Sequence, residues 1–188
     1  KEGGTGNGTS WENACGSIQQ AIENCKVAGS GTVYIAEGVY YECVTFPSRS
    51  NNVKLLGSFP KNGGDVQNYR GTPSIIDGRN QPYCMQIKHC SNVTVDGILM
   101  RGGHTGSIPI NKLEANHAGG LEMNYASGVI SNCTFIDNNK YGLEVHEGVV
   151  VKDCIIGKNS SGVYCDDASV VDSYILQNNG VGITINGG

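Results

Sequence analysis

The chain has 188 residues, a formal net charge of −4, 28 glycines and only 7% aromatic residues. This length suits one domain with a continuous core, and the acidic balance argues against a phosphate-backbone partner. No apolar run approaches the roughly 18 residues of a membrane-spanning helix. The composition therefore predicts neither a nucleic-acid partner nor a membrane span.

One helix is predicted near the N-terminus, over residues 14–28. Ser10 and Asn13 are its candidate N-caps, and Gly29 begins the glycine-rich segment that ends it. Four positions share one helical face at the required spacing: Ile18, Ala21, Ile22 and Cys25. Because the rest of the chain is typical of strands, we expect this helix to cover the open first coil of a strand solenoid.

Short alternating apolar runs follow the helix, and two polar segments interrupt them. Residues 58–73 and 103–119 are rich in turn residues, and they predict two loop excursions from the coils. The second excursion contains His104 and His117 near its two ends. Solvated loop histidines are the more common outcome, although either ring could lean over a neighbouring sheet face.

The segment from Gly120 to Asn186 repeats one pattern four times. Each line begins with a glycine, at Gly120, Gly142, Gly162 and Gly182, and the spacings are 22, 20 and 20 residues. A period near 20, built of short apolar runs and Gly/Asn turns, indicates a solenoid of strands. Since the last line stops in mid-repeat and Lys1 is no natural start, we expect a fragment of a longer chain that continues beyond Gly188.

The eight cysteines include no Cys-x-x-Cys pair, which argues against a zinc site. An even number would suit disulfides in a secreted chain. However, Cys133, Cys154 and Cys165 occupy inward repeat positions, where cysteine commonly serves as a small buried apolar residue. Stacked Cys133 and Cys154 could still be close enough to bond, so both interpretations stay open.

Several stretches carry a family resemblance: Gly6-Asn-Gly-Thr-Ser-Trp11, Val33-Tyr-Ile-Ala-Glu-Gly-Val-Tyr40, Ile75-Ile-Asp-Gly78 and Val95-Asp-Gly-Ile-Leu-Met-Arg-Gly-Gly103. They resemble secreted bacterial right-handed parallel β-helix proteins of the pectate-lyase-like superfamily. Phe135-Ile-Asp-Asn138 is similar to a short repeat of surface adhesins. The resemblance implies an all-β, single-stranded parallel β-helix at an extracellular or bacterial cell-surface location. It does not select an activity, because the superfamily mixes lyases, glycosidases, adhesins and structural modules.

Alternation along the repeated strands separates inward from outward positions. The inward columns are Leu121/Leu143/Val163/Ile183 and Met123/Val145/Cys165/Ile185. The outward columns are Glu122/Glu144/Tyr164/Thr184 and Asn124/His146/Asp166/Asn186, with Gln86 and Lys88 one coil earlier. Only the outward columns can meet a ligand.

Stacking would bring Glu122 and Glu144 together, with His146 and Asp166 beside them. Adjacent like charges need compensation, which a Ca²⁺ ion on Glu122, Glu144 and Asp166 would supply. A shared proton would instead favour acid–base catalysis by Glu122, Glu144, His146 and Asp166, at a spacing near that of retaining glycosidases. The plainest alternative is that both glutamates splay into water, near Lys88 or another exposed base. Substrate-binding candidates on this face are Gln86, Lys88, Asn124 and Tyr164.

Other catalytic patterns are weaker. Asp166 and Asp167 are similar to the paired aspartates of pectin hydrolases, but His146 precedes them and Asp167 falls in a turn, so the family roles do not carry over. A polysaccharide lyase would need a basic residue, for which Lys88, Arg101 and Lys152 are available without a motif that selects one.

The predicted function is an extracellular or cell-surface module that engages a polysaccharide or cell-surface glycan on its outward strand face. A regularly spaced sheet face suits a repeating sugar chain. One alternative is a polysaccharide lyase or glycosidase, and another is a structural stalk or adhesin segment without a site of its own. No cofactor is predicted except the candidate Ca²⁺.

Overall fold

Three parallel β-sheets and one helix make up the chain in a computed structural model that describes residues 1–104 and 119–187. Successive strands join sheets A, B and C in turn, so the chain winds through stacked coils of three strands each. Coil 1 is formed by β1 to β3, and coil 6 by β16 to β18.

The strand bounds follow this order. Sheet A contains β1 (Gly31–Ala36), β4 (Val53–Phe59), β7 (Val93–Asp96), β10 (Gly128–Ser131), β13 (Val149–Lys152) and β16 (Ser169–Val171). Sheet B contains β2 (Gly38–Tyr40), β5 (Ser74–Asp77), β8 (Ile98–Arg101), β11 (Thr134–Ile136), β14 (Ile155–Gly157) and β17 (Tyr174–Leu176). Sheet C contains β3 (Val44–Thr45), β6 (Tyr83–Lys88), β9 (Gly119–Asn124), β12 (Tyr141–Val145), β15 (Ser161–Asp166) and β18 (Ile183–Asn186).

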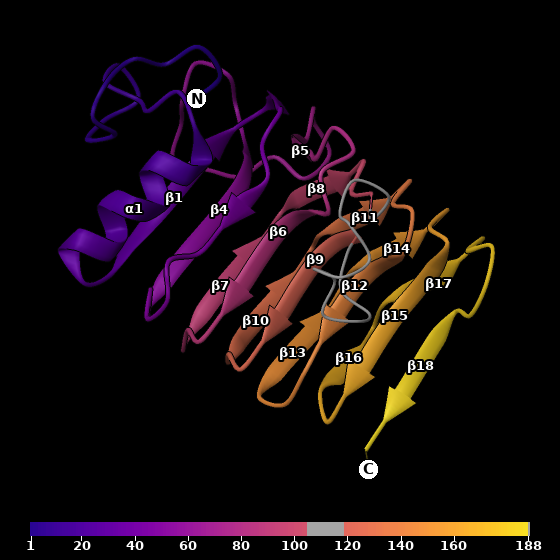
Figure 1. Ribbon diagram of the computed structural model, residues 1–188. Coiled ribbons are helices and arrows are strands. Elements are labelled where there is room, and N and C mark those ends of the chain that lie inside the picture. The colour runs from indigo at the N-terminus through magenta and orange to yellow at the C-terminus, as the bar shows by residue number, and fades with distance from the viewer. Residues whose placement is uncertain (105–118, 188) are drawn as a thin grey trace.

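The coils lie side by side from α1 at one end of the molecule to β18 at the other (Figure 1). Each strand pairs in parallel with the strand three elements earlier, as in β9 with β12 and β12 with β15. This arrangement confirms the predicted parallel β-helix.

The core runs through the middle of the coils, where the inward columns stack. Leu121, Leu143 and Val163 are in register and at most 2% exposed, and the second column behaves in the same way through Met123 and Val145. Complete burial of such a side chain contributes about 1.5–3 kcal/mol. In β18, the outermost strand of sheet C, the same columns are more exposed, at 40% for Ile183 and 69% for Ile185.

Residues in the left-handed region turn the chain at the corners between sheets. At the corner from sheet A to sheet B, φ is 50° at Asn132, 55° at Asp153 and 45° at Asp172. Asn and Asp tolerate this conformation better than other non-glycine residues. This preference explains why an Asn or Asp follows the sheet A strand in each of coils 4 to 6.

Helix α1 (Ile18–Ala28) packs against β1, β3 and β4 and buries Ile18 and Ile22, as the apolar spacing predicts. The predicted N-cap was wrong. The cap is Ser17, whose hydroxyl accepts from the Gln20 N–H, and not Ser10 or Asn13. The carboxylate of Glu42, in coil 1, also accepts from the backbone N–H groups of Ile18 and Gln19 at 2.9 and 3.0 Å. An anion at this end suits the helix dipole and fastens the helix to the first coil.

The first loop excursion leaves after β4 and returns at β5, close to the predicted residues 58–73, although Ser58 and Phe59 belong to β4. The second excursion, predicted over residues 103–119, lies largely outside the described residues, which resume at Gly119 in β9. His117 therefore also lies outside them. His104 is described, and its Nε2 lies 3.0 Å from the Asn139 amide nitrogen.

A ladder of three buried or half-buried asparagines joins coils 4 to 6 after sheet B. The Asn159 side chain accepts from the Asn138 N–H and donates to the Phe135 carbonyl, both at 3.0 Å. Asn178 continues the ladder by accepting from the Asn159 N–H at 3.0 Å. Asn139 and Asn179, which follow Asn138 and Asn178 in the sequence, are exposed neighbours of this ladder and not its members.

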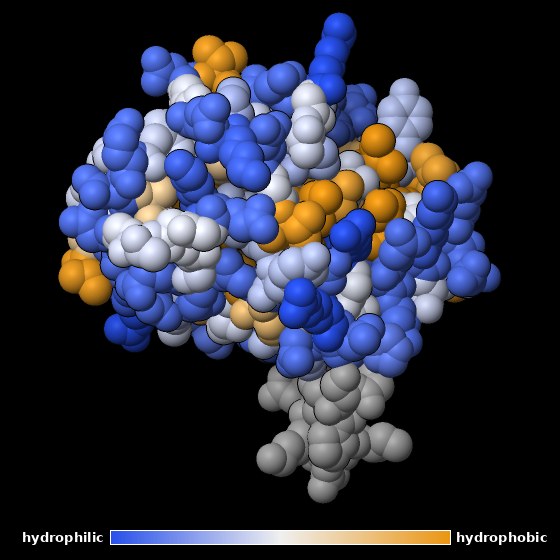
Figure 2. All heavy atoms as spheres, turned by 90° about the horizontal axis from the view of Figure 1, so that it is seen from above, coloured by the Kyte–Doolittle hydropathy of each residue, from blue (hydrophilic) through white to orange (hydrophobic). Residues whose placement is uncertain are grey.

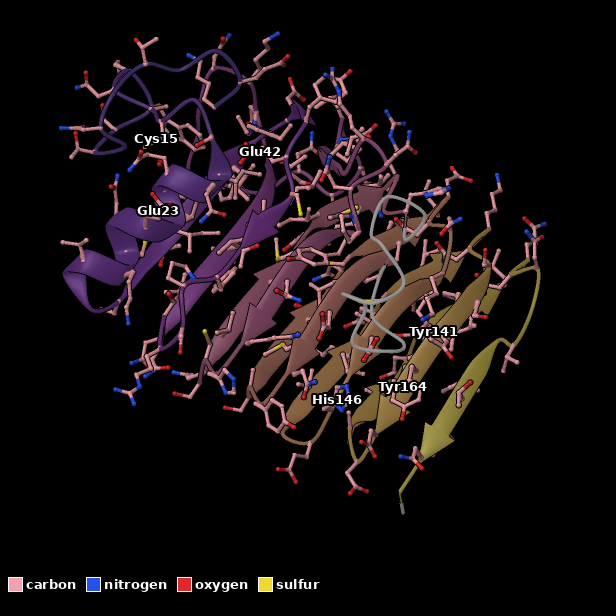
Figure 3. The ribbon with its side chains drawn as sticks, in the orientation of Figure 1. Cys15, Glu23, Glu42, Tyr141, His146 and Tyr164 are labelled. Atoms are coloured by element: carbon pink, nitrogen blue, oxygen red, sulfur yellow. The ribbon has the colours of Figure 1, made fainter. Side chains whose placement is uncertain are left out.

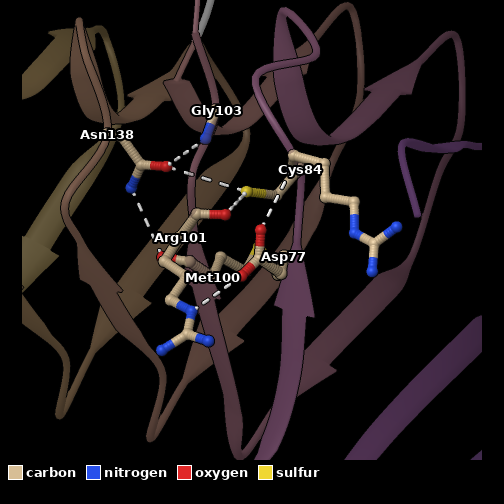
Figure 4. A network of polar contacts seen from close by, with 7 residues as sticks. Asp77, Cys84, Met100, Arg101, Gly103 and Asn138 are labelled. Atoms are coloured by element: carbon tan, nitrogen blue, oxygen red, sulfur yellow. Dashed lines mark hydrogen bonds and ion pairs between the residues drawn. The ribbon is translucent and has the colours of Figure 1, made fainter. Parts of the chain in front are cut away.

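The ladder ends in the polar network of Figure 4. The Asn138 carbonyl oxygen accepts from the Gly103 N–H at 2.9 Å, and its amide donates to the Met100 carbonyl at 3.3 Å. Beside it, Arg101 Nε donates to Asp77 Oδ2 at 2.9 Å, between neighbouring strands of sheet B. The network fastens coils 2, 3 and 4 to one another.

Seen from above, apolar side chains form a small patch within a largely hydrophilic surface (Figure 2). The outward column of sheet B contains Ile75 and Leu99 in coils 2 and 3, Thr134 in coil 4 and Ile155 in coil 5, with Tyr174 at 70% exposure in coil 6. A small apolar patch of this kind is ordinary on protein surfaces.

Candidate functional site

The candidate site is the outward face of sheet C, where neighbouring strands bring the predicted residues into register. Glu122 pairs with Gln86 on one side and with Glu144 on the other, and Tyr164 and Thr184 continue the column. Lys88 pairs with Asn124, and Asp166 pairs with Asn186. Since the cross-strand neighbours are those that the repeat predicts, the two outward columns are confirmed.

Glu122 is surrounded by side chains from the preceding coil. Lys88 Nζ lies 2.9 Å from Glu122 Oε1, and the Gln86 amide donates to Glu122 Oε2 at 2.7 Å. The Tyr83 hydroxyl in turn donates to the Gln86 carbonyl oxygen at 3.1 Å. A charge-assisted pair and an oriented amide therefore hold this carboxylate in place.

Glu144 takes part in a second charged group, with His146 and Asp166. His146 Nε2 lies 3.2 Å from Glu144 Oε1, and His146 Nδ1 lies 3.3 Å from Asp166 Oδ2. An imidazolium donates from both ring nitrogens and can serve both carboxylates at once, whereas a neutral ring can donate to only one. The histidine thus bridges two neighbouring strands.

Both glutamates are buried, which corrects the expectation that they splay into water. Glu122 is 1% exposed and Glu144 is 3% exposed, although both point away from the apolar core. The expected proximity of Lys88 to a glutamate is confirmed at Glu122. Solvent instead reaches the half-exposed residues around the glutamates, namely Lys88, Asn124, His146, Tyr164 and Asp166.

Tyrosine rings border the charged groups, as Figure 3 shows for Tyr141, His146 and Tyr164. The ring centroids of Tyr141 and Tyr164 are 5.8 Å apart, and the His146 ring lies 5.8 Å from Tyr164. Lys140 Nζ lies 5.9 Å from the Tyr141 centroid, and burial lowers the pKa of this lysine while Glu144 opposes the shift. Aromatic rings beside carboxylates give the face both apolar and polar contacts.

The sequence prediction omitted Tyr83 and Tyr141. They stand two residues before Met85 and Leu143, which are the first inward residues of their repeat lines. Strict alternation would have placed both tyrosines inward, on the side of Met85 and Leu143, so the repeat pattern did not indicate them; the alternation breaks where Cys84 and Gly142 are buried next to these inward residues.

The predicted Ca²⁺ site does not fit this geometry. Within residues 1–104 and 119–187, no group of three or more His, Cys, Asp or Glu side chains is arranged to hold a metal ion. Lys88 contacts Glu122, and His146 contacts both Glu144 and Asp166, so the three predicted ligands face cationic or imidazole partners. Such partners compensate the carboxylates without a metal ion.

Two of the three candidate lyase bases lie elsewhere. Arg101 is in β8 of sheet B, where it pairs with Asp77, and Lys152 is in β13 of sheet A. Only Lys88 lies on the outward face of sheet C, next to Glu122. Asp167 adopts a left-handed turn conformation after β15 with φ of 50°, as the alternation predicts.

A cavity of about 540 Å³ lies at the opposite end of the molecule, between the N-terminal segment, α1 and β1. Trp11, Cys15 and Tyr34 are among its lining residues, and none of the predicted site residues reaches it. The charged groups of sheet C therefore form a surface site that is separate from this cavity.

A protein-family model that describes a right-handed β-helix region matches residues 7–188. The chain belongs to the right-handed β-helix family. This membership confirms the predicted handedness and agrees with the three parallel sheets of the β-helix. No curated protein and no solved structure is similar enough to this β-helix to count as a match.

No helix among the described residues of the β-helix is both long and apolar enough to span a membrane.

Proposed function

We propose that this β-helix binds a polysaccharide on the outward face of sheet C. The supporting observation is the Tyr141–Tyr164 ring pair beside the His146–Asp166 and Lys88–Glu122 groups. A sugar ring offers an apolar C–H face to an aromatic side chain and hydroxyl groups to carboxylates, amides and amines. The half-exposed side chains of this face provide both kinds of contact.

In this proposal the buried glutamates position the groups that meet the glycan. Glu122 holds Lys88, and Glu144 holds His146, so both basic side chains are oriented before a ligand arrives. A side chain that is already ordered loses less conformational entropy on binding, which favours affinity.

The contact groups come from successive coils, in β6, β9, β12 and β15, which repeat at about 4.8 Å along the solenoid axis. A linear glycan would therefore cross the strands and follow the axis, meeting similar groups at each coil. Extended glycans occur mainly outside cells, so the proposal includes an extracellular or bacterial cell-surface location.

The test is binding of a panel of immobilised polysaccharides to the wild type and to Tyr164→Ala. We expect at least one glycan to be retained, with binding about tenfold weaker in the variant, which corresponds to about 1.4 kcal/mol. Tyr174→Ala is the matched control, because this tyrosine is 70% exposed on sheet B, and its binding should equal that of the wild type. Failure to retain any glycan, or equal loss in both variants, would leave the structural stalk or adhesin segment as the better interpretation.

A second candidate function is cleavage of the bound glycan. It is favoured by Glu122 and Glu144, which are in register on neighbouring strands at about 4.8 Å between backbones. Retaining glycosidases place two carboxyl groups about 5–5.5 Å apart. New reducing ends that disappear in Glu144→Gln would establish hydrolysis, and an unsaturated product would establish a lyase. A retained but intact glycan would favour binding alone.

A further inference from the structure

Cys133 and Cys154 lie directly opposite each other in coils 4 and 5. Ser131 pairs with Lys152 just before them, and Thr134 pairs with Ile155 just after them. The two cysteines therefore share a register position at the corner between sheets A and B. Neighbouring parallel strands lie about 4.8 Å apart. The two Cα atoms of a disulfide are usually about 4.4–6.8 Å apart, so this spacing is compatible with a bond.

Both side chains are buried in the core: Cys133 is 1% exposed and Cys154 is 0% exposed. The Cys154 thiol reaches toward coil 4, where it lies 3.8 Å from the Ile130 carbonyl, and it also lies 3.2 Å from the Lys152 carbonyl. The Cys133 thiol lies 3.7 Å from the Val95 carbonyl of coil 3. Because the backbones are already in register, rotation of the Cys133 side chain toward coil 5 is the movement that a cross-link requires.

We propose that Cys133 and Cys154 form a disulfide that cross-links coils 4 and 5 when the chain folds in the presence of a small-molecule disulfide. Because both thiols are buried in the folded chain, a small disulfide must react with them before the core closes. The resulting bond would restrain the unfolded chain and stabilise the stacked coils.

The chemistry is thiol–disulfide exchange in two steps. The Cys154 thiolate attacks one sulfur of the small disulfide, breaks its S–S bond and releases one small thiolate. The Cys133 thiolate then attacks the Cys154 sulfur of the mixed disulfide and expels the second small thiolate. In total two cysteine protons are released and one small disulfide is reduced to two thiols.

In the folded chain, burial and the neighbouring Cys154 raise the pKa of Cys133, whereas the neighbouring Cys133 lowers the pKa of Cys154. These shifts belong to the folded pair, and the exchange takes place before the core closes. The balance of the two steps is the same when the roles of the two thiols are exchanged.

A second stacked pair serves as an internal control. Cys43 and Cys84 precede the paired residues Val44 and Met85, so they also occupy one register position in neighbouring coils. The Cys84 thiol, however, donates to the Arg101 carbonyl at 2.9 Å, a much shorter contact than the 3.7 Å between the Cys133 thiol and the Val95 carbonyl. Because both contacts point away from the partner cysteine, the shorter one should hold Cys84 in place and leave this second pair unlinked.

The test is oxidative refolding of the wild-type chain in a mixture of reduced and oxidised glutathione. The product is denatured in an alkylating agent, and its peptides are mapped by mass without reduction. We expect the peptides of Cys133 and Cys154 to be joined to each other and the other cysteines to be alkylated. Full alkylation of Cys133 and Cys154, or a link to any other cysteine, would overturn the proposal.

Cys154→Ser provides a second measurement. Serine already occupies the equivalent position in coil 6, at Ser173, where the hydroxyl donates to the Val171 carbonyl at 2.7 Å. In the oxidised wild type we expect added reductant to lower the melting temperature. In this variant Cys133 should become alkylated, and added reductant should leave the melting temperature unchanged. A reductant effect that persists in the variant would contradict the cross-link, and a variant that fails to fold leaves the wild-type peptide map to decide.

Discussion

Asp96, at the end of β7, fastens the first loop excursion to the solenoid. Its carboxylate accepts from Gln67 and Tyr69 of the loop and from Ser131 and Asn132 of the next coil. Burial raises the pKa of this carboxyl, but the four donors together outweigh it and leave the pKa below its usual value. One side chain therefore connects three separate segments.

We predict that Asp96→Asn lowers the free energy of unfolding by about 1–3 kcal/mol, because an NH₂ group replaces an oxygen that faces two donors. The difference in unfolding free energy between wild type and variant should be largest above the unfolded-state pKa, about 4. It should shrink as the pH falls through the lower folded-state pKa. Urea unfolding at several pH values measures it. Asp65→Asn, at an exposed loop position, should match the wild type, and an equally large effect there would contradict the assignment.

At the same scale, Glu122 and Glu144 show where sequence reasoning stops. Alternation correctly placed both side chains away from the core, because strand geometry is local. Their exposure was predicted wrongly, since burial depends on neighbours such as Lys88 and His146 that come from other positions and other strands.

Among the elements, the Asn138–Asn159–Asn178 ladder replaces strand pairing at the turns after sheet B. The fully buried Asn159 side chain makes hydrogen bonds to two backbone groups of coil 4, the Asn138 N–H and the Phe135 carbonyl. The repeat indicated a recurring asparagine, but with two adjacent asparagines in coils 4 and 6 it could not identify which one turns inward.

We predict that Asn159→Ala lowers the free energy of unfolding by about 3 kcal/mol, because it leaves the Asn138 N–H and the Phe135 carbonyl buried without their partner. Thermal and urea unfolding measure the loss. Asn179→Ala, at the exposed neighbouring position of coil 6, is the control. Equal stability of the two variants would show that the ladder contributes little.

For the whole molecule, stability should vary along the solenoid axis, because each coil contacts only its neighbours. Helix α1 covers coil 1, whereas the strands of coil 6 contain exposed apolar residues such as Ile183 and Ile185. The central coils pack against a coil on each side.

We predict that backbone amides of β16, β17 and β18 exchange with solvent more than about tenfold faster than those of β7 to β12, since local opening costs less where fewer apolar contacts are lost. Hydrogen exchange followed by mass spectrometry of peptides measures this difference. Uniform protection along the axis would instead indicate that the solenoid opens as one cooperative unit.

Sequence alone determined the solenoid, the inward and outward columns and the apolar face of α1, because a period near 20 and alternation within strands are properties of the chain itself. Tertiary structure alone decided that Ser17 and Glu42 cap the helix, that Glu122 and Glu144 are buried beside basic partners, and that Tyr83 and Tyr141 border the site. The Ser17 cap is a local contact with the Gln20 N–H, but the Glu42 cap, the burial of the glutamates and the tyrosine pair depend on contacts between residues that are far apart along the chain. Such contacts are set by how the coils stack, and a local pattern does not record them.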